Sequence, residues 1–339
     1  MKPFLKATLV TVGALLAGLG IFALVANFVF ANNGSDATET SSPSLTRDGD
    51  TGKIKVVTST QVWADITELV GGEWVEVSAI VPDNQDPHSY EATARDQLAI
   101  SEADLVIANG GGYDSFMDQL VAATDTDLIF LKLVEGEHLH AGEAEASHED
   151  HDHSHDHDHE HEANEHIWYD FALTLDAANH IVEAIVELRP EAKESTQAGV
   201  EFLTSEMGNL ELRLEALRER ALGLGFIATE GVANLMLLNA GFENLTPDAL
   251  ADAVEEERDA PLDALEEAKA LLENKVAEIL VVNITTTDAA TDQLIAAAEA
   301  GNRKIIRVSE TASGADATAD LDYLDWMNLI LDQLQEAIY

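Results

Sequence analysis

The heptapeptide NEHIWYD at residues 164–170 separates two kinds of sequence pattern. Before it, from residue 53 to residue 131, short β-branched runs alternate with stretches of helical periodicity. After it, only helical periodicity is found up to residue 222, and alternation then resumes. Inside the heptapeptide, His166 is followed by three apolar residues that would anchor its backbone to a folded body. We therefore expect His166 to hold a fixed position.

The alternating regions predict two lobes, each with a small parallel β-sheet flanked by helices. In the first lobe, the expected strands are 53–58, 75–81, 104–108 and 127–131, with helices at 61–70, 93–102 and 115–122. In the second lobe, the expected strands are 225–228, 242–245, 277–283 and 304–308, with helices at 231–239, 261–274, 289–300 and 321–338. Strands that alternate with helices are typical of parallel sheets covered on both faces. The expected fold class is α/β.

Helical segments at 171–187 and 190–222 lie between the two alternating regions. The second of them is about 30 residues long, which exceeds a typical globular helix, and Pro190 suits its first turn. We interpret it as a rod that joins the lobes. The expected domains are an N-terminal α/β lobe at 53–188, a linking helix at 189–222 and a C-terminal α/β lobe at 223–339.

The first 52 residues are expected to lie outside both lobes. Lys2 and Lys6 precede an apolar run at 7–26, so residues 1–31 are typical of a signal peptide or an N-terminal membrane anchor. Residues 32–52 are rich in Ser, Thr, Asn, Asp and Gly and predict a flexible linker. The chain has no cysteine, which excludes a bacterial lipid anchor, a disulfide framework and a thiolate metal site. We expect an extracytoplasmic protein, secreted or anchored to the cell membrane by its N-terminal segment.

Residues 135–165 form a histidine-rich tract with nine histidines, twelve acidic residues and no Lys or Arg. Such a segment cannot bury an apolar core, and we expect a mobile, solvated loop. Its imidazoles and carboxylates favour weak binding of transition metals over a role as a passive acidic spacer. The net charge of −46 makes nucleic acids and anionic substrates poor candidates and attracts cations, although solubility explains the acidity equally well.

Four candidate metal ligands follow expected strands: His88 and His166 in the first lobe, and Glu230 and Asp288 in the second. Open α/β sheets bind ligands at the carboxyl ends of their strands, so one pair from each lobe would face the other across a cleft. Imidazole with carboxylate suits zinc and extends to manganese, whereas the absence of sulfur argues against copper(I) and iron–sulfur clusters. Because histidine binds metal in its neutral form, metal affinity should fall as the pH drops through roughly 6 to 7.

Each candidate also has an ordinary structural interpretation. The spacings of 78, 64 and 58 residues between them match no local metal motif. His88 would be a surface residue, and Glu230 and Asp288 would cap the helices that follow them, which is the favoured interpretation of Asp288. Neither a His-Glu-x-x-His motif nor a nucleophile elbow occurs, so no catalytic residue is predicted.

From about residue 54 to its end, the chain resembles the zinc and manganese substrate-binding proteins of bacterial ABC importers. The resemblance rests on VVTSTQVW at 56–63, DPHSYE at 86–91, ADLVIANG at 103–110 and NEHIWYD at 164–170. It implies two lobes joined by one long rigid helix, with a metal ion held between them. It also implies that His88 and His166 are the histidine ligands of the first lobe.

Glu230 occupies the third-ligand position of that family, where members have histidine or glutamate, and it resembles the manganese-type members. Many relatives take their fourth ligand from an acid after the penultimate strand, but VNITTTD at 282–288 departs from that motif, which leaves Asp288 or water.

The resemblance implies a monomeric solute-binding protein, not an enzyme, that captures a divalent metal ion. Zinc is favoured, with manganese as the alternative, and the ion would pass to an ABC permease driven by a cytoplasmic ATPase. The rival functions are those of a metal-binding adhesin or buffer, and of a zinc hydrolase with Glu230 or Asp288 as its general base.

Overall fold

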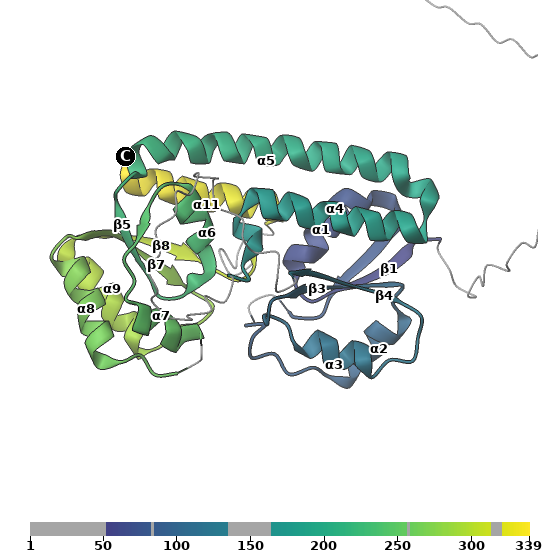
Figure 1. Cartoon of the computed structure of the whole chain (residues 1–339), viewed down its shortest axis with the longest axis horizontal. Helices are drawn as coiled ribbons and strands as arrows, with labels where there is room; N and C mark the ends of the chain where they lie inside the picture. The colour runs from purple at the N-terminus through teal and green to yellow at the C-terminus, as the bar shows by residue number, and fades with distance from the viewer. Residues whose placement is uncertain (1–51, 83–84, 135–163, 256–257, 313–320) are drawn as a thin grey trace, which may run out of the picture. The chain divides into compact units, whose positions relative to one another are not determined.

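The computed structural model describes residues 52–82, 85–134, 164–255, 258–312 and 321–339, which belong to one unit of the chain, residues 49–339 (Figure 1). The predicted leader, nearly all of the linker, and the histidine-rich tract up to residue 163 lie outside the described residues. Within the described residues, no helix is both long and apolar enough to cross a lipid bilayer.

The first sheet contains β1 (Ile54–Thr58), β2 (Val75–Ala79), β3 (Leu105–Gly110) and β4 (Ile129–Val134), in the order β2-β1-β3-β4. All neighbouring strands are parallel. One face packs on α1 (Gln61–Gly71) and α4 (Phe171–Leu188), and the other on α2 (Ala94–Glu102) and α3 (Phe116–Ala122) (Figure 1). Strand β3 is buried along its whole length because both of its faces are covered.

The second sheet contains β5 (Gly225–Ala228), β6 (Glu243–Asn244), β7 (Ala277–Asn283) and β8 (Lys304–Val308), in the parallel order β6-β5-β7-β8. One face packs on α6 (Asn234–Asn239) and α11 (Tyr323–Ile338). The other packs on α7 (Asp248–Glu255), α8 (Leu262–Glu273) and α9 (Ala289–Gly301). The expected fold class is confirmed, whereas helix α7 was not predicted from the sequence.

The expected rod is α5 (Lys193–Ala221), a helix of 29 residues that follows a short turn of 3-10 helix at Pro190–Ala192. It contacts α1 and α4 of the first lobe and α11 of the second, and Figure 1 shows it running alongside α4 and α11. Its buried side chains, including Leu203, Leu210 and Leu217, belong to one apolar cluster with side chains of both sheets. Apolar packing therefore joins the lobes in addition to the covalent connection.

At Gly199, helix α5 passes close to the backbone of α1. A Cβ atom at residue 199 would lie 2.8 Å from Val70 Cα and 2.9 Å from Val70 O, which are backbone atoms that cannot rotate away. We expect Gly199→Ala to lower the free energy of unfolding by roughly 1–3 kcal/mol. Gly208→Ala in the same helix is the matched control, because a Cβ there meets nothing within 4 Å. It should raise that free energy by about 0.5–1 kcal/mol.

Urea unfolding of the two variants, with a chelator present, measures both changes. If both variants had the same free energy of unfolding, the close packing of α5 on α1 at Gly199 would not contribute to stability.

Candidate metal centre

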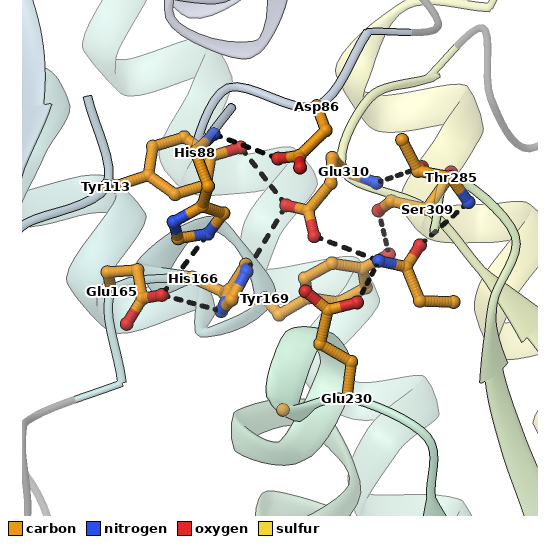
Figure 2. A network of polar contacts seen from close by, with 12 residues as sticks. Asp86, His88, Tyr113, Glu165, His166, Tyr169, Glu230, Thr285, Ser309 and Glu310 are labelled. Carbon is orange, nitrogen blue, oxygen red and sulfur yellow. Dashed lines mark hydrogen bonds and ion pairs between the residues drawn. The ribbon is translucent and has the colours of Figure 1, made fainter. Parts of the chain in front are cut away.

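The carboxyl ends of the strands of both sheets meet at a group of imidazoles and carboxylates, which we call the central cluster. Figure 2 shows its side chains pointing toward one another. Its members are His88, Glu165, His166, Glu230 and Glu310. Three of them were selected from the sequence, and Glu165 and Glu310 were not.

His166 lies at the centre of the cluster and is 4% exposed. Its backbone N–H donates to Asn164 Oδ1 at 2.9 Å, and its ring Nδ1 lies 3.0 Å from the same oxygen. Asn164 Nδ2 donates to the Gly231 carbonyl, so Oδ1 is the acceptor and Nδ1 carries a proton. This leaves the lone pair of neutral His166 on Nε2, which lies 3.2 Å from Glu310 Oε2. An outer acceptor on one ring nitrogen and a second nitrogen that faces a carboxylate are typical of a metal ligand.

The backbone that carries His166 is held by the first lobe. Trp63 Nε1 donates to Asn109 Oδ1 at 3.1 Å, and Asn109 Nδ2 donates to the Glu165 carbonyl at 3.0 Å. The apolar residues Ile167–Tyr169 form a buried turn of 3-10 helix. The expectation that they anchor His166 in a fixed position is confirmed.

His88 lies nearer the surface, with 28% of its side chain exposed. Its backbone N–H donates to Asp86 Oδ1 at 2.9 Å, and its ring packs edge-on against Tyr113 with centroids 4.8 Å apart. Glu165 Oε1 lies 3.5 Å from His88 Nε2 and 4.0 Å from His166 Nδ1. His88, Glu165 and His166 thus offer ligand atoms that all lie within 4.8 Å of one another.

Glu310 enters the cluster from the second lobe, two residues beyond β8, and is fully buried. Its Oε2 lies 3.2 Å from His166 Nε2 and accepts a hydrogen bond of 3.1 Å from Tyr113 Oη. Burial by itself would raise the pKa of Glu310. The nearby His166 imidazole has the largest of the opposite effects, which together place the pKa of Glu310 below its ordinary value.

Glu230 lies two residues beyond β5, and its Oε2 accepts from Asn283 Nδ2 at 2.6 Å and Thr286 Oγ1 at 2.5 Å. Burial, followed by the negative charge of Glu310, raises the pKa of Glu230.

Asp288 is not part of the cluster. Its Oδ1 accepts from the Thr291 N–H at 2.7 Å and caps the amino end of α9, which is the interpretation that the sequence favoured. It lines the same cavity as His88 and Glu230, which has a volume of about 760 Å³. The second acid that the second lobe brings to His166 is Glu310 rather than Asp288. The loop after β8 turns Glu310 toward His166, whereas the carboxylate of Asp288 is held by the amino end of α9.

The two lobes are linked beside the cluster by hydrogen bonds other than those of Asn164. Tyr169 Oη donates to the Ser309 carbonyl at 3.0 Å, next to Glu310. Asn239 Nδ2 donates to Asp170 Oδ2 at 2.8 Å. These bonds hold the loops of one lobe against those of the other.

The carboxylates of the cluster determine the charge of His166. Burial disfavours the imidazolium form of His166, but Glu310, Glu165 and Glu230 together outweigh burial and raise its pKa to about 9. Near neutral pH, His166 therefore carries a proton whose place a metal cation can take. Two imidazoles and two or three carboxylates match the ligand chemistry of zinc and manganese.

Comparisons with known proteins agree with this chemistry. The model of a family described as zinc-uptake complex component A, periplasmic, matches residues 56–337. The chain is 26% identical over 190 residues to the manganese-binding lipoprotein MntA of Halalkalibacterium halodurans, which is 56% of this chain and 55% of that protein. It is 45% identical over 62 residues to the metal ABC transporter substrate-binding lipoprotein FimA of Streptococcus parasanguinis, which is 18% of this chain and 20% of that protein. The chain thus spans between about a fifth and about half of the length of these relatives.

Among solved structures, the periplasmic zinc-binding protein TroA of Treponema pallidum shares the fold. It has a TM-score of 0.64 and 17% identity, over 85% of this chain and 99% of that one. Because the family model extends from β1 nearly to the end of α11, the chain belongs to the zinc-uptake complex component A family.

Proposed function

We propose that this protein is the extracytoplasmic receptor of an ABC importer and that it binds one divalent metal ion, zinc in preference to manganese. The ligands would be His88, His166, Glu230 and Glu310. The observation that carries the proposal is the convergence of these side chains from both lobes around His166, whose Nε2 atom faces the Glu310 carboxylate. The names of FimA, MntA and TroA support a transported metal as the cargo, and include both manganese and zinc.

The charge of the four proposed ligands suits a dication. Two ionised carboxylates and two neutral imidazoles carry a net charge of −2, which one divalent ion offsets, whereas a monovalent ion would leave a buried negative charge. The net charge of −46 raises the local concentration of cations around the protein. The ion would be captured and released without covalent chemistry, and a permease with a cytoplasmic ATPase would receive it.

The rival functions find less support. A zinc hydrolase needs a carboxylate free to act as base near a metal-bound water. Glu230 is held by Asn283 and Thr286, and Asp288 caps α9. An adhesin or a metal buffer would use the same metal site and would differ in its partner rather than in its chemistry. For the location, we propose that residues 1–31 direct export, and that the protein is then either secreted or anchored by this segment. A lipid anchor like that of the lipoprotein relatives would need a cysteine, and the chain has none.

Metal stoichiometry tests the proposal and separates the site from the histidine-rich tract. A variant that lacks residues 138–161 should retain one tightly bound zinc ion and lose several weak equivalents. The matched control adds His166→Ala to the deletion and should lose the tight ion as well. Native mass spectrometry after dialysis against equal zinc and manganese reports the number and the identity of the bound ions. Loss of the tight ion on deletion alone would show that the tract is itself the site.

A further inference from the structure

Asn283, at the carboxyl end of β7, lies between the two carboxylates that the second lobe contributes. It is fully buried, and its Nδ2 lies 2.6 Å from Glu230 Oε2 and 3.1 Å from Glu310 Oε1. The orientation of its amide group is determined by the backbone, because Asn283 Oδ1 accepts from the Thr285 N–H at 3.0 Å. Its NH₂ group must therefore face the two acids.

The hydrogen bonds of Asn283 divide the carboxylate oxygens into two sets. Glu230 Oε2 accepts from Asn283 and from Thr286 Oγ1, which itself lies 3.1 Å from Asn283 Nδ2. Glu310 Oε1 also accepts from Asn283. Asn283 does not contact Glu230 Oε1 or Glu310 Oε2. Glu310 Oε2 faces His166 Nε2 and accepts one hydrogen bond, from Tyr113 Oη. Each carboxylate thus has one oxygen that Asn283 leaves to the metal, and Glu310 Oε2 keeps a second lone pair beside its bond from Tyr113.

The number of available donor atoms bears on metal preference. Two single carboxylate oxygens and one nitrogen from each of His88 and His166 make four donors, the number that zinc takes in tetrahedral sites. Manganese prefers six donors with octahedral geometry and many oxygens, which carboxylates supply most readily when both of their oxygens bind the ion. A hydrogen bond from Asn283 to one oxygen of each acid opposes binding of the metal ion through both oxygens of that acid.

We propose that Asn283 is a positioning residue that sets metal preference, because it occupies one oxygen of Glu230 and one of Glu310 and so keeps both acids to a single metal bond. The inference rests on the proposed function, since it concerns the same metal site. The inference explains why this site would favour zinc even though its third ligand, Glu230, is a glutamate. Asn283 itself would not touch the ion.

Cobalt(II) spectroscopy of the full-length chain tests the donor number directly. At less than one equivalent of cobalt, the unaltered protein should show the intense visible absorption of four-coordinate cobalt. In Asn283→Ala, the second carboxylate oxygens become available, and the absorption should fall toward that of five- or six-coordinate cobalt. Zinc affinity should fall by about 10–100-fold, as for other outer-shell changes, with a smaller loss for manganese. The ratio of zinc to manganese affinity should thus fall by about tenfold.

Two further variants keep the test interpretable. Asn283→Leu has nearly the same size and no donor, so it should change the spectrum in the same direction if Asn283→Ala does not fold. Asn328→Ala is the matched control, because Asn328 accepts from Arg213 Nη1 and contacts neither acid. It should leave both the cobalt spectrum and the affinity ratio unchanged.

The results of these measurements separate this inference from the proposed function. A protein that binds zinc tightly, with a cobalt spectrum and an affinity ratio that neither substitution of Asn283 alters, would overturn the role of Asn283 alone. A six-coordinate spectrum in the unaltered protein would do the same. Failure of the unaltered protein to bind either metal would overturn both proposals.

Discussion

Glu310→Gln should lower zinc affinity by more than about 100-fold, whereas Asp288→Asn should change it by less than about threefold. Glu310 is fully buried against His166, and its amide counterpart keeps the shape and can still accept from Tyr113 while the charge is lost. Asp288 uses its carboxylate to cap α9, and asparagine is an equally good capping residue. The two substitutions are the same chemical change at the two acids that compete for the role of fourth ligand.

Competition with a chelator of known zinc affinity measures both variants on one scale, and thermal melting without metal checks that each is folded. If Asp288→Asn lost affinity while Glu310→Gln retained it, the fourth ligand would be the residue selected from the sequence, and the lobes would rearrange on binding. If neither variant lost affinity, the site would need no fourth protein ligand, as the sequence analysis also allowed.

The architecture was largely predictable because it rests on local patterns. Strands β7 and β8 begin and end at the predicted residues, since each is an apolar run that is fully or alternately buried and bounded by polar residues. Strand β4 was expected at 127–131 but runs from Ile129 to Val134, because its pairing with β3 determines its bounds. Helix α7 was missed because it has only eight residues in an acidic segment, and it is held by the burial of Leu250 and Ala253.

The candidate site was predictable only in part. The rule that selects Glu230, an acid two residues beyond a strand, applies equally to Glu310, whereas the family resemblance points to the penultimate strand and so to Asp288. Which strand-end acid turns inward depends on partners that are distant in the sequence. Tyr113, which donates to Glu310, is 197 residues away from it. Glu165 was assigned to the solvated tract by composition, although its carbonyl is held by Asn109 and its carboxylate reaches both histidines.

Zinc affinity should rise about tenfold per pH unit up to about pH 9, and about 100-fold between pH 5.5 and pH 7.5 from His166 alone. The sign follows from the raised pKa of His166, which shifts from an ordinary value near 6.5 to about 9. Below that pKa, the metal-free site holds a proton on His166 that zinc must displace, and above it no proton competes. The sequence alone placed the loss at roughly pH 6 to 7, because it assumed an unperturbed histidine. The buried acids around His166 move the expected range upward.

Calorimetry at pH 7.5, in two buffers with different ionisation enthalpies, should detect about one proton released for each zinc ion bound. Glu310→Gln is the informative control, because loss of the facing charge lowers the pKa of His166 and should reduce that release. Equal affinity at pH 7.5 and pH 8.5, with no proton released, would mean that His166 is neutral in the metal-free protein. Equal affinity at pH 5.5 and pH 7.5 would be more serious, because a zinc-binding imidazole whose pKa is at or above its ordinary value must compete with protons in that range. That result would remove His166 from the ligand set and leave its Nε2 atom as the partner of Glu310 alone.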